Sequence, residues 1–179
     1  MSEYWGRRFA QEGMIWGSDP SPTALIARDL FRQHKVTSVL VPGAGYGRNT
    51  KVFSMHLFLQ KDRRRLVANC LELLRPGGLL YFTCFSNQDP NNGCGRLLEP
   101  GTYEYKEGKY AHFFSEDDLR EHFEGTEIVE TGPYSEKLPS PEGGTHQYIL
   151  RYIIARKMPL QTKGLASYGL TPRQVTFSE

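Results

Sequence analysis

The stretch VTSVLVPGAGYGRNTKVFS, residues 36–54, decides how the fold of this chain is interpreted. The β-branched and apolar run from Val36 to Val41 predicts a short strand, which Pro42 and Gly43 end. Glycines recur at Gly43, Gly45 and Gly47, and a helix is expected after them. Such a turn lets a ligand approach the main chain beside the free N–H groups of the helix start. The same pattern is equally typical of a plain strand-to-helix turn.

A second strand–helix pattern follows after a short interval. Residues Asp62–Leu74 predict a helix with an apolar stripe, formed by Leu66, Val67, Cys70, Leu73 and Leu74. Arg63, Arg64 and Arg65 are expected on its solvated face. Pro76-Gly77-Gly78 ends the helix, and the run LLYFTCFS, residues 79–86, lacks polar alternation and therefore predicts a fully buried strand.

The remaining segments frame this unit. Pro22 starts an expected helix with Leu25, Ile26, Asp29 and Leu30 on one face. Residues 87–111 are rich in Asn, Gly and Pro and predict a long loop. Ser115 is expected to cap a helix, and TEIVETG and HQYILRYIIARK are expected to be the last strands. We predict one domain over residues 1–157 and a C-terminal appendage over 158–179.

Composition restricts the class of protein. The chain has 179 residues, of which 39% are hydrophobic, and a net charge of +2, which gives no reason to expect a nucleic-acid or membrane partner. The three cysteines have no paired-ligand spacing and favour reduced thiols in a cytoplasmic protein, without a metal site. A dinucleotide fingerprint would place glycine at position 48, where this chain has Arg48, so the turn argues against NAD or FAD.

Three separated motifs, in order, resemble class I S-adenosylmethionine-dependent methyltransferases. VLVPGAGYGRN resembles their first motif, LLRPGGLLYFTCFS their later Pro-Gly-Gly turn and buried strand, and HFFSEDDLREHFEGTEIVETG with YILRYIIARK the end of their fold. The small-molecule branch, which includes the tellurite-resistance and thiopurine methyltransferases, is the most similar and carries a tryptophan like Trp16 before its first helix. The resemblance implies a three-layer Rossmann-like α/β fold, with a mostly parallel sheet and an antiparallel C-terminal strand.

The resemblance also implies a cofactor and a site. S-adenosylmethionine would be held by Trp16 and the turn at the start of the helix, namely Gly43, Ala44, Gly45, Tyr46, Gly47, Arg48 and Asn49. Trp16, Tyr110 and His112 would line the pocket for a small-molecule substrate. His56 would face the active site as a base or steering group. The alternatives without a functional role are a surface arginine at position 48, core or strand-edge aromatic residues, and a partly buried histidine at position 56.

Two features depart from the family pattern. Pro42 stands where the first motif usually has an acidic residue. Only 30 residues separate Gly47 from Gly77, whereas one strand–helix–strand unit needs roughly 30 or more, so at least one unit is absent between Ser54 and Met55. The absent part would hold the ribose hydroxyls and flank the adenine.

Three explanations of the absent segment stay open. The shortening is natural or engineered, a second copy of the chain completes the site, or a mobile part of the protein is missing from the sequence. Uncovered strand edges would favour a homodimer with residues 48–60 near the interface. The alternative to methyl transfer is an inactive remnant of the fold that serves as a binding or oligomerisation module.

Overall fold

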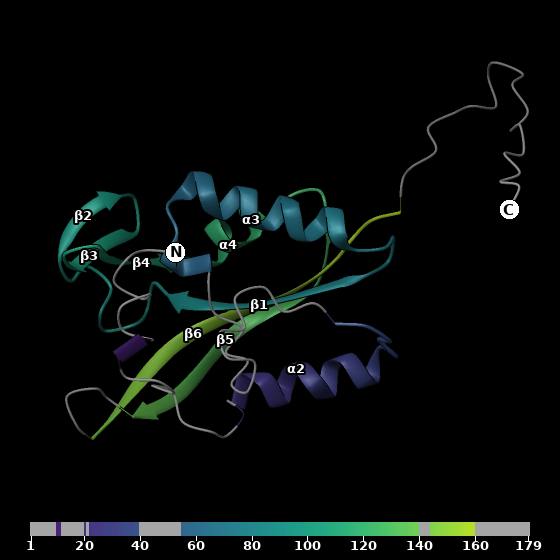
Figure 1. Ribbon diagram of the computed structural model, residues 1–179, viewed down its shortest axis with the longest axis horizontal. Helices are drawn as coiled ribbons and strands as arrows, with labels where there is room; N and C mark the ends of the chain where they lie inside the picture. The colour runs from purple at the N-terminus through teal and green to yellow at the C-terminus, as the bar shows by residue number, and fades with distance from the viewer. Residues whose placement is uncertain (1–9, 12–19, 21, 40–54, 140–143, 160–179) are drawn as a thin grey trace, which may run out of the picture.

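The computed structural model describes residues 10–11, 20, 22–39, 55–139 and 144–159. Its elements are α2 (Pro22–Gln33), η1 (Met55–Leu57), α3 (Gln60–Leu73), β1 (Leu79–Ser86), β2 (Arg96–Glu99), β3 (Thr102–Lys106), β4 (Lys109–Phe114), α4 (Glu116–His122), β5 (Glu127–Pro139) and β6 (Thr145–Arg156). The strands form one six-stranded sheet in the order β2-β3-β4-β1-β6-β5. Helices α3 and α4 lie on one face of the sheet and α2 on the other (Figure 1).

The three layers follow from the alternation of side chains along β1. Phe82 and Cys84 belong to the larger core cluster, which they share with Val67 of α3 and Leu119 of α4. Tyr81 points to the other face, where it packs with Ala27 of α2. The predicted α/β class and the antiparallel C-terminal strand are therefore confirmed, because β6 pairs antiparallel with β1 from Leu79 to Phe85.

The expectation of a mostly parallel sheet is corrected. Among the described strands only β1 and β4 pair in parallel, through Phe85↔Phe113 and Ser86↔Phe114, and the other four pairings are antiparallel. Parallel neighbours need long crossover connections, whereas β2, β3 and β4 follow one another through short turns at Gly101 and Gly108. The prediction of a loop over residues 87–111 is also wrong, because these residues include β2, β3 and the start of β4.

The expected strand at Val36–Val41 is not found in its described part. Residues 36–39 adopt no strand, and Val39 is 54% exposed. A strand needs a neighbouring strand to satisfy its backbone hydrogen bonds. In this sheet both positions beside β1 are occupied, by β4 and β6. Positions 40 and 41 lie outside the described residues.

Two helices begin close to the predicted positions but bury other side chains. In α2 the buried residues are Thr23 and Ala27, whereas Leu25 is 38% and Ile26 is 43% exposed. In α3 Val67 and Cys70 are buried as expected, but Leu73 is exposed and Arg63 is buried. The prediction of a solvated Arg63 is therefore wrong, and its partners are described below.

In α4 Ser115 caps the helix as predicted, accepting the backbone N–H of Asp118.

Candidate functional site

The carboxyl ends of β1 and β4 lie side by side and define the candidate site. These two strands form the parallel pair of the sheet, and they end at Ser86 and Phe114. In open α/β sheets, ligands bind beyond the carboxyl ends of the parallel strands. The side chains around this end are therefore the ones to examine.

A row of aromatic side chains crosses the sheet at this end, on the same face as α2. Tyr103, Phe113, Phe85 and Tyr148 come from the neighbouring strands β3, β4, β1 and β6. Phe85 stacks on Phe113 and on Tyr148, with ring centroids 5.6 Å apart in both pairs. Tyr103 lies 6.2 Å from Phe113. We call these four residues the aromatic row.

His56 lies against the aromatic row from η1. Its ring centroid is 4.2 Å from that of Phe85, and the side chain is buried. Burial lowers the pKa of His56 to about 3, with a smaller contribution from His112. The imidazole is therefore neutral at pH 7, and its predicted role as a base or steering group stays a prediction.

The loop after β1 is fixed against β6 by the buried Asp89. One carboxylate oxygen accepts the backbone N–H of Asn91 at 2.9 Å, and the other accepts the backbone N–H of Ile149 at 2.9 Å. The Asn91 side chain in turn lies 3.1 Å from Nε2 of His146, whose ring packs edge-on against Tyr148 at 4.4 Å. An amide and an imidazole side chain therefore border the aromatic row.

On the opposite face of β4, His112 belongs to a buried polar network. Its Nε2 lies 2.6 Å from the Asp118 carboxylate and its Nδ1 lies 2.8 Å from the Thr102 hydroxyl. The Thr102 hydroxyl donates to Oε1 of Glu99 at 3.1 Å. Because a carboxylate only accepts, Nε2 of His112 carries the proton when the ring is neutral. Burial lowers the pKa of His112, which favours that neutral form, and the bond to Asp118 offsets the shift only in part.

Arg63 completes this network from α3. Its Nε donates to Nε2 of His122 at 3.3 Å, and its Nη1 donates to the Glu99 carboxylate at 2.8 Å. Because arginine only donates, the Nδ1 of His122 carries the proton and donates to the backbone oxygen of Asp118 at 2.8 Å. The network thus joins α3, β2, β4 and α4 beneath the candidate site.

The predicted site residues fall into two groups. Trp16 and the whole glycine turn, Gly43–Asn49, lie outside the described residues, so their contacts with a cofactor stay predictions. Tyr110 is half-buried on β4, and burial raises its pKa. His112 follows two residues later and is 3% exposed with both ring nitrogens engaged, which gives it a structural role here. Its predicted contact with a substrate stays untested.

Sequence reasoning missed the aromatic row and the buried Asp89. The alternation of aromatic and other residues in TYEYK, residues 102–106, and KYAHFF, residues 109–114, is the available signal for half-buried strands. The sequence around Asp89 gives no signal of its burial, because its carboxylate accepts the backbone N–H of Ile149, 60 residues further along the chain.

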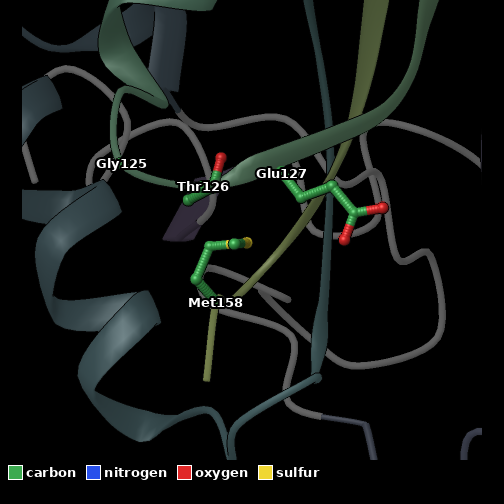
Figure 2. A pocket seen from close by; sticks show the side chains of 4 residues that line it. All are labelled: Gly125, Thr126, Glu127 and Met158. Carbon is green, nitrogen blue, oxygen red and sulfur yellow. The ribbon is translucent and has the colours of Figure 1, made fainter. Parts of the chain in front are cut away.

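A pocket occurs at the opposite end of the sheet. Gly125, Thr126, Glu127 and Met158 line it, between the start of β5 and the end of β6 (Figure 2). Glu127 pairs with Arg156, which also pairs with Leu79, the first residue of β1. The pocket is therefore at the amino end of β1 and separate from the candidate site.

Among the residues that the structure describes, no group of three or more His, Cys, Asp or Glu side chains is placed to hold a metal ion. The cysteines Cys70, Cys84 and Cys94 are free thiols. In the same part of the chain, no helix is long and apolar enough to cross a membrane.

Comparison with known proteins gives partial matches. No family model matches the chain. It is 32% identical over 72 residues to the tRNA N(3)-methylcytidine methyltransferase Mettl2 of Drosophila melanogaster, and this match covers 38% of the chain and 22% of that protein. This relative is a methyltransferase, the class that the sequence motifs resemble.

Three solved structures are similar at low identity. A SAM-dependent methyltransferase from Methanosarcina mazei is 22% identical, with 55% of this chain and 52% of that chain covered and a TM-score of 0.41. The 1,6-didemethyltoxoflavin-N1-methyltransferase of Burkholderia thailandensis, solved with 1,6-didemethyltoxoflavin and S-adenosylhomocysteine, is 23% identical, with 59% and 41% covered and a TM-score of 0.38. TehB from Haemophilus influenzae is 19% identical, with 56% and 32% covered and a TM-score of 0.38. The match thus spans about half or less of each of these chains.

Proposed function

We propose that the chain binds S-adenosylmethionine and transfers its methyl group to a small, partly apolar acceptor. The observation that carries the proposal is the 72-residue match to a methyltransferase. The glycine turn at Gly43–Gly47 and the Pro-Gly-Gly turn at Pro76–Gly78 support it, because both belong to the pattern of that class.

The reaction is a direct displacement. A lone pair of the acceptor attacks the methyl carbon in line with the sulfur, the S–CH₃ bond breaks with its electrons going to sulfur, and S-adenosylhomocysteine leaves. The acceptor then loses a proton to solvent if it carried one. Such a reaction depends mainly on alignment and on exclusion of water.

The described residues suit the acceptor side of this reaction. The aromatic row offers flat apolar surfaces, and aromatic faces also attract a positively charged sulfonium. His56, neutral at pH 7 with a pKa of about 3, offers a polar atom without a charge. On the cofactor side, the proposal assigns Trp16 and Gly43–Asn49, with Arg48 facing the cofactor carboxylate.

Calorimetry provides the first test. Intact mass spectrometry must first show that the protein used has the mass of about 20.4 kDa that belongs to this sequence. Titration with S-adenosylhomocysteine should then give saturable binding. A matched Gly45→Val variant should bind at least about tenfold more weakly, because a side chain there would hold the ligand away from the backbone. If the verified chain does not bind, the proposal fails and the inactive remnant becomes the better description.

A second candidate acceptor is an RNA base. The relative Mettl2 is by name a tRNA methyltransferase, and this favours tRNA over other nucleic acids. Transfer of tritiated methyl groups should be measured in parallel on total tRNA and on a panel of small heterocycles and thiols. Label in small molecules alone supports our first proposal, whereas label in tRNA alone replaces it with the second.

Self-association is also part of the proposal. If residues are absent between Ser54 and Met55, a partner chain could supply the missing cover. Light scattering at micromolar concentration should then show more than one chain per particle. A stable monomer of verified mass would contradict this.

A further inference from the structure

Helix α3 begins without a capping residue of its own. Its N-cap position is Leu59, whose side chain offers no acceptor. The first helical N–H, that of Gln60, is instead accepted by Oε1 of Glu99 at 2.8 Å. A carboxylate at the N-terminus of a helix is also favoured by the helix dipole. Glu99, at the end of β2, therefore caps α3 from a distant part of the chain.

The buried Arg63 contacts the same place, the backbone of residues 58–60 between η1 and α3, which we call the junction. Arg63 is 2% exposed, and its Nη1 donates both to Glu99 and to the backbone oxygen of Phe58, the latter at 2.6 Å. The planar guanidinium can serve these acceptors and His122 at once, which a lysine cannot. Arg63 and Glu99 thus fix the backbone from Phe58 to Gln60 against β2 and α4.

This backbone directly follows η1. The N–H of Phe58 donates to the backbone oxygen of Met55 at 3.3 Å, so the carboxyl end of η1 is continuous with the segment that Arg63 holds. Met55 is fully buried in the core, and the next residue, His56, lies against Phe85 of the aromatic row. The place of His56 at the candidate site therefore depends on where this junction is anchored.

We propose that Arg63 and Glu99 are positioning residues that hold His56 against the aromatic row. The importance of this contact for catalysis rests on the proposed function. The positioning itself concerns only this chain's own residues and is measurable without a cofactor.

Histidine resonances of the full chain, labelled with ¹³C and ¹⁵N, provide the test. In the wild-type protein the His56 ring should titrate near pH 3. In Glu99→Gln and Arg63→Lys the junction loosens, water reaches His56, and its midpoint should rise by about one pH unit or more toward the ordinary value of about 6.5. Arg64→Met is the matched control, because Arg64 is exposed on the same helix and pairs only with Glu121 among the described residues. Its His56 titration should be unchanged.

The readouts separate a positioning role from a purely structural one. A variant that shifts the resonances of His122 but leaves the His56 titration unchanged overturns the proposal, because the network is then disturbed without effect on the site. If Arg63→Lys does not fold, Glu99→Gln carries the test, since its amide oxygen can still accept from Gln60 while the ion pair with Arg63 is lost. Binding of S-adenosylhomocysteine is measured separately on the wild-type chain. If the wild-type chain does not bind S-adenosylhomocysteine but the titration midpoint of His56 shifts in the variants, the proposed function is refuted and the positioning role is supported.

Discussion

Nε2 of His112 lies 2.6 Å from the carboxylate of Asp118, across the turn that joins β4 to α4. Burial alone would raise the pKa of Asp118, but the hydrogen bonds from His112 and His122 outweigh burial and hold that pKa well below its ordinary value. Carboxyl groups with a lowered pKa stabilise the folded state above their unfolded pKa of about 3.9, and this stabilisation is lost as the pH falls through the folded pKa.

Asp118→Asn should therefore cost about 1–3 kcal/mol of unfolding free energy at pH 7, because the buried His112 keeps its shape-matched neighbour but loses a charged acceptor. The deficit should be smaller at pH 3, where the wild-type chain has lost part of the same stabilisation. Urea unfolding at the two pH values measures both. Asp117→Asn, an exposed neighbour in the same helical turn, is the control. Equal losses in the two variants at pH 7 would contradict the prediction.

The lowered pKa of His56 predicts a second pH dependence of the folding stability. Its folded pKa of about 3 lies below the unfolded value of about 6.5, so the unfolded chain takes up the proton first as the pH falls. Stability should be greatest above pH 6.5 and decline toward pH 3, by on the order of a few kcal/mol. His56→Gln should reduce this slope in urea unfolding between pH 7 and pH 4. Part of the slope that remains belongs to His112, whose pKa burial also lowers.

The histidine at the end of α2 supplies the control. His34→Gln removes an imidazole outside the network and outside the aromatic row, and its slope is the reference for the slope of His56→Gln. If His56→Gln and His34→Gln have the same slope, His56 is not buried in its neutral form.

The larger core predicts a strong effect of one aromatic residue. Phe123 is fully buried and meets the ring of Phe82 edge-on, with centroids 5.4 Å apart. Phe123→Ala should cost about 3–5 kcal/mol, because it leaves a cavity between α4 and β1. Leu73→Ala, on a side chain that is 70% exposed, should change stability by less than about 0.5 kcal/mol. Similar midpoints of denaturation for the two variants would contradict the burial of Phe123 in this core.

Elements with strong local signals could be predicted from the sequence. The strand at 79–86 agrees with β1 to the residue, because an unbroken apolar run follows the Pro-Gly-Gly turn. Ser115 caps α4 as expected, since both the cap and the acidic first turn are local. In each case the residues that decide the structure lie within a few positions of one another.

Features that depend on distant residues could not be predicted. The burial of Arg63 depends on Glu99, which follows it by 36 residues. The sequence of residues 87–111 predicts a loop, because its polar and glycine residues hide short strands whose stability comes from pairing. In α2 the small Ala27 faces Tyr81 of the sheet, so the buried face is set by a fit that hydropathy does not report.

Two glycines of the turn before β2 differ in a way that can be measured. Gly93 has φ +88° and Gly95 has φ +103°, so both adopt a conformation that other residues rarely take. A Cβ on Gly93 would have no atom within 4 Å, whereas a Cβ on Gly95 would lie 2.3 Å from the backbone oxygen of Glu104. Gly93→Ala therefore costs backbone strain alone, of about 1–3 kcal/mol. Gly95→Ala adds a clash that side-chain movement cannot relieve.

Gly95→Ala should consequently be the more damaging substitution, and its effect should reach beyond the turn. To make room, the start of β2 must move away from β3, and β2 carries Glu99, the cap of α3. We expect faster amide hydrogen exchange at Gln60 in Gly95→Ala than in Gly93→Ala, together with a lower urea midpoint. The comparison is internal, since both variants add one methyl group to the same loop. Equal exchange at Gln60 in the two variants would show that β2 does not hold the N-terminus of α3.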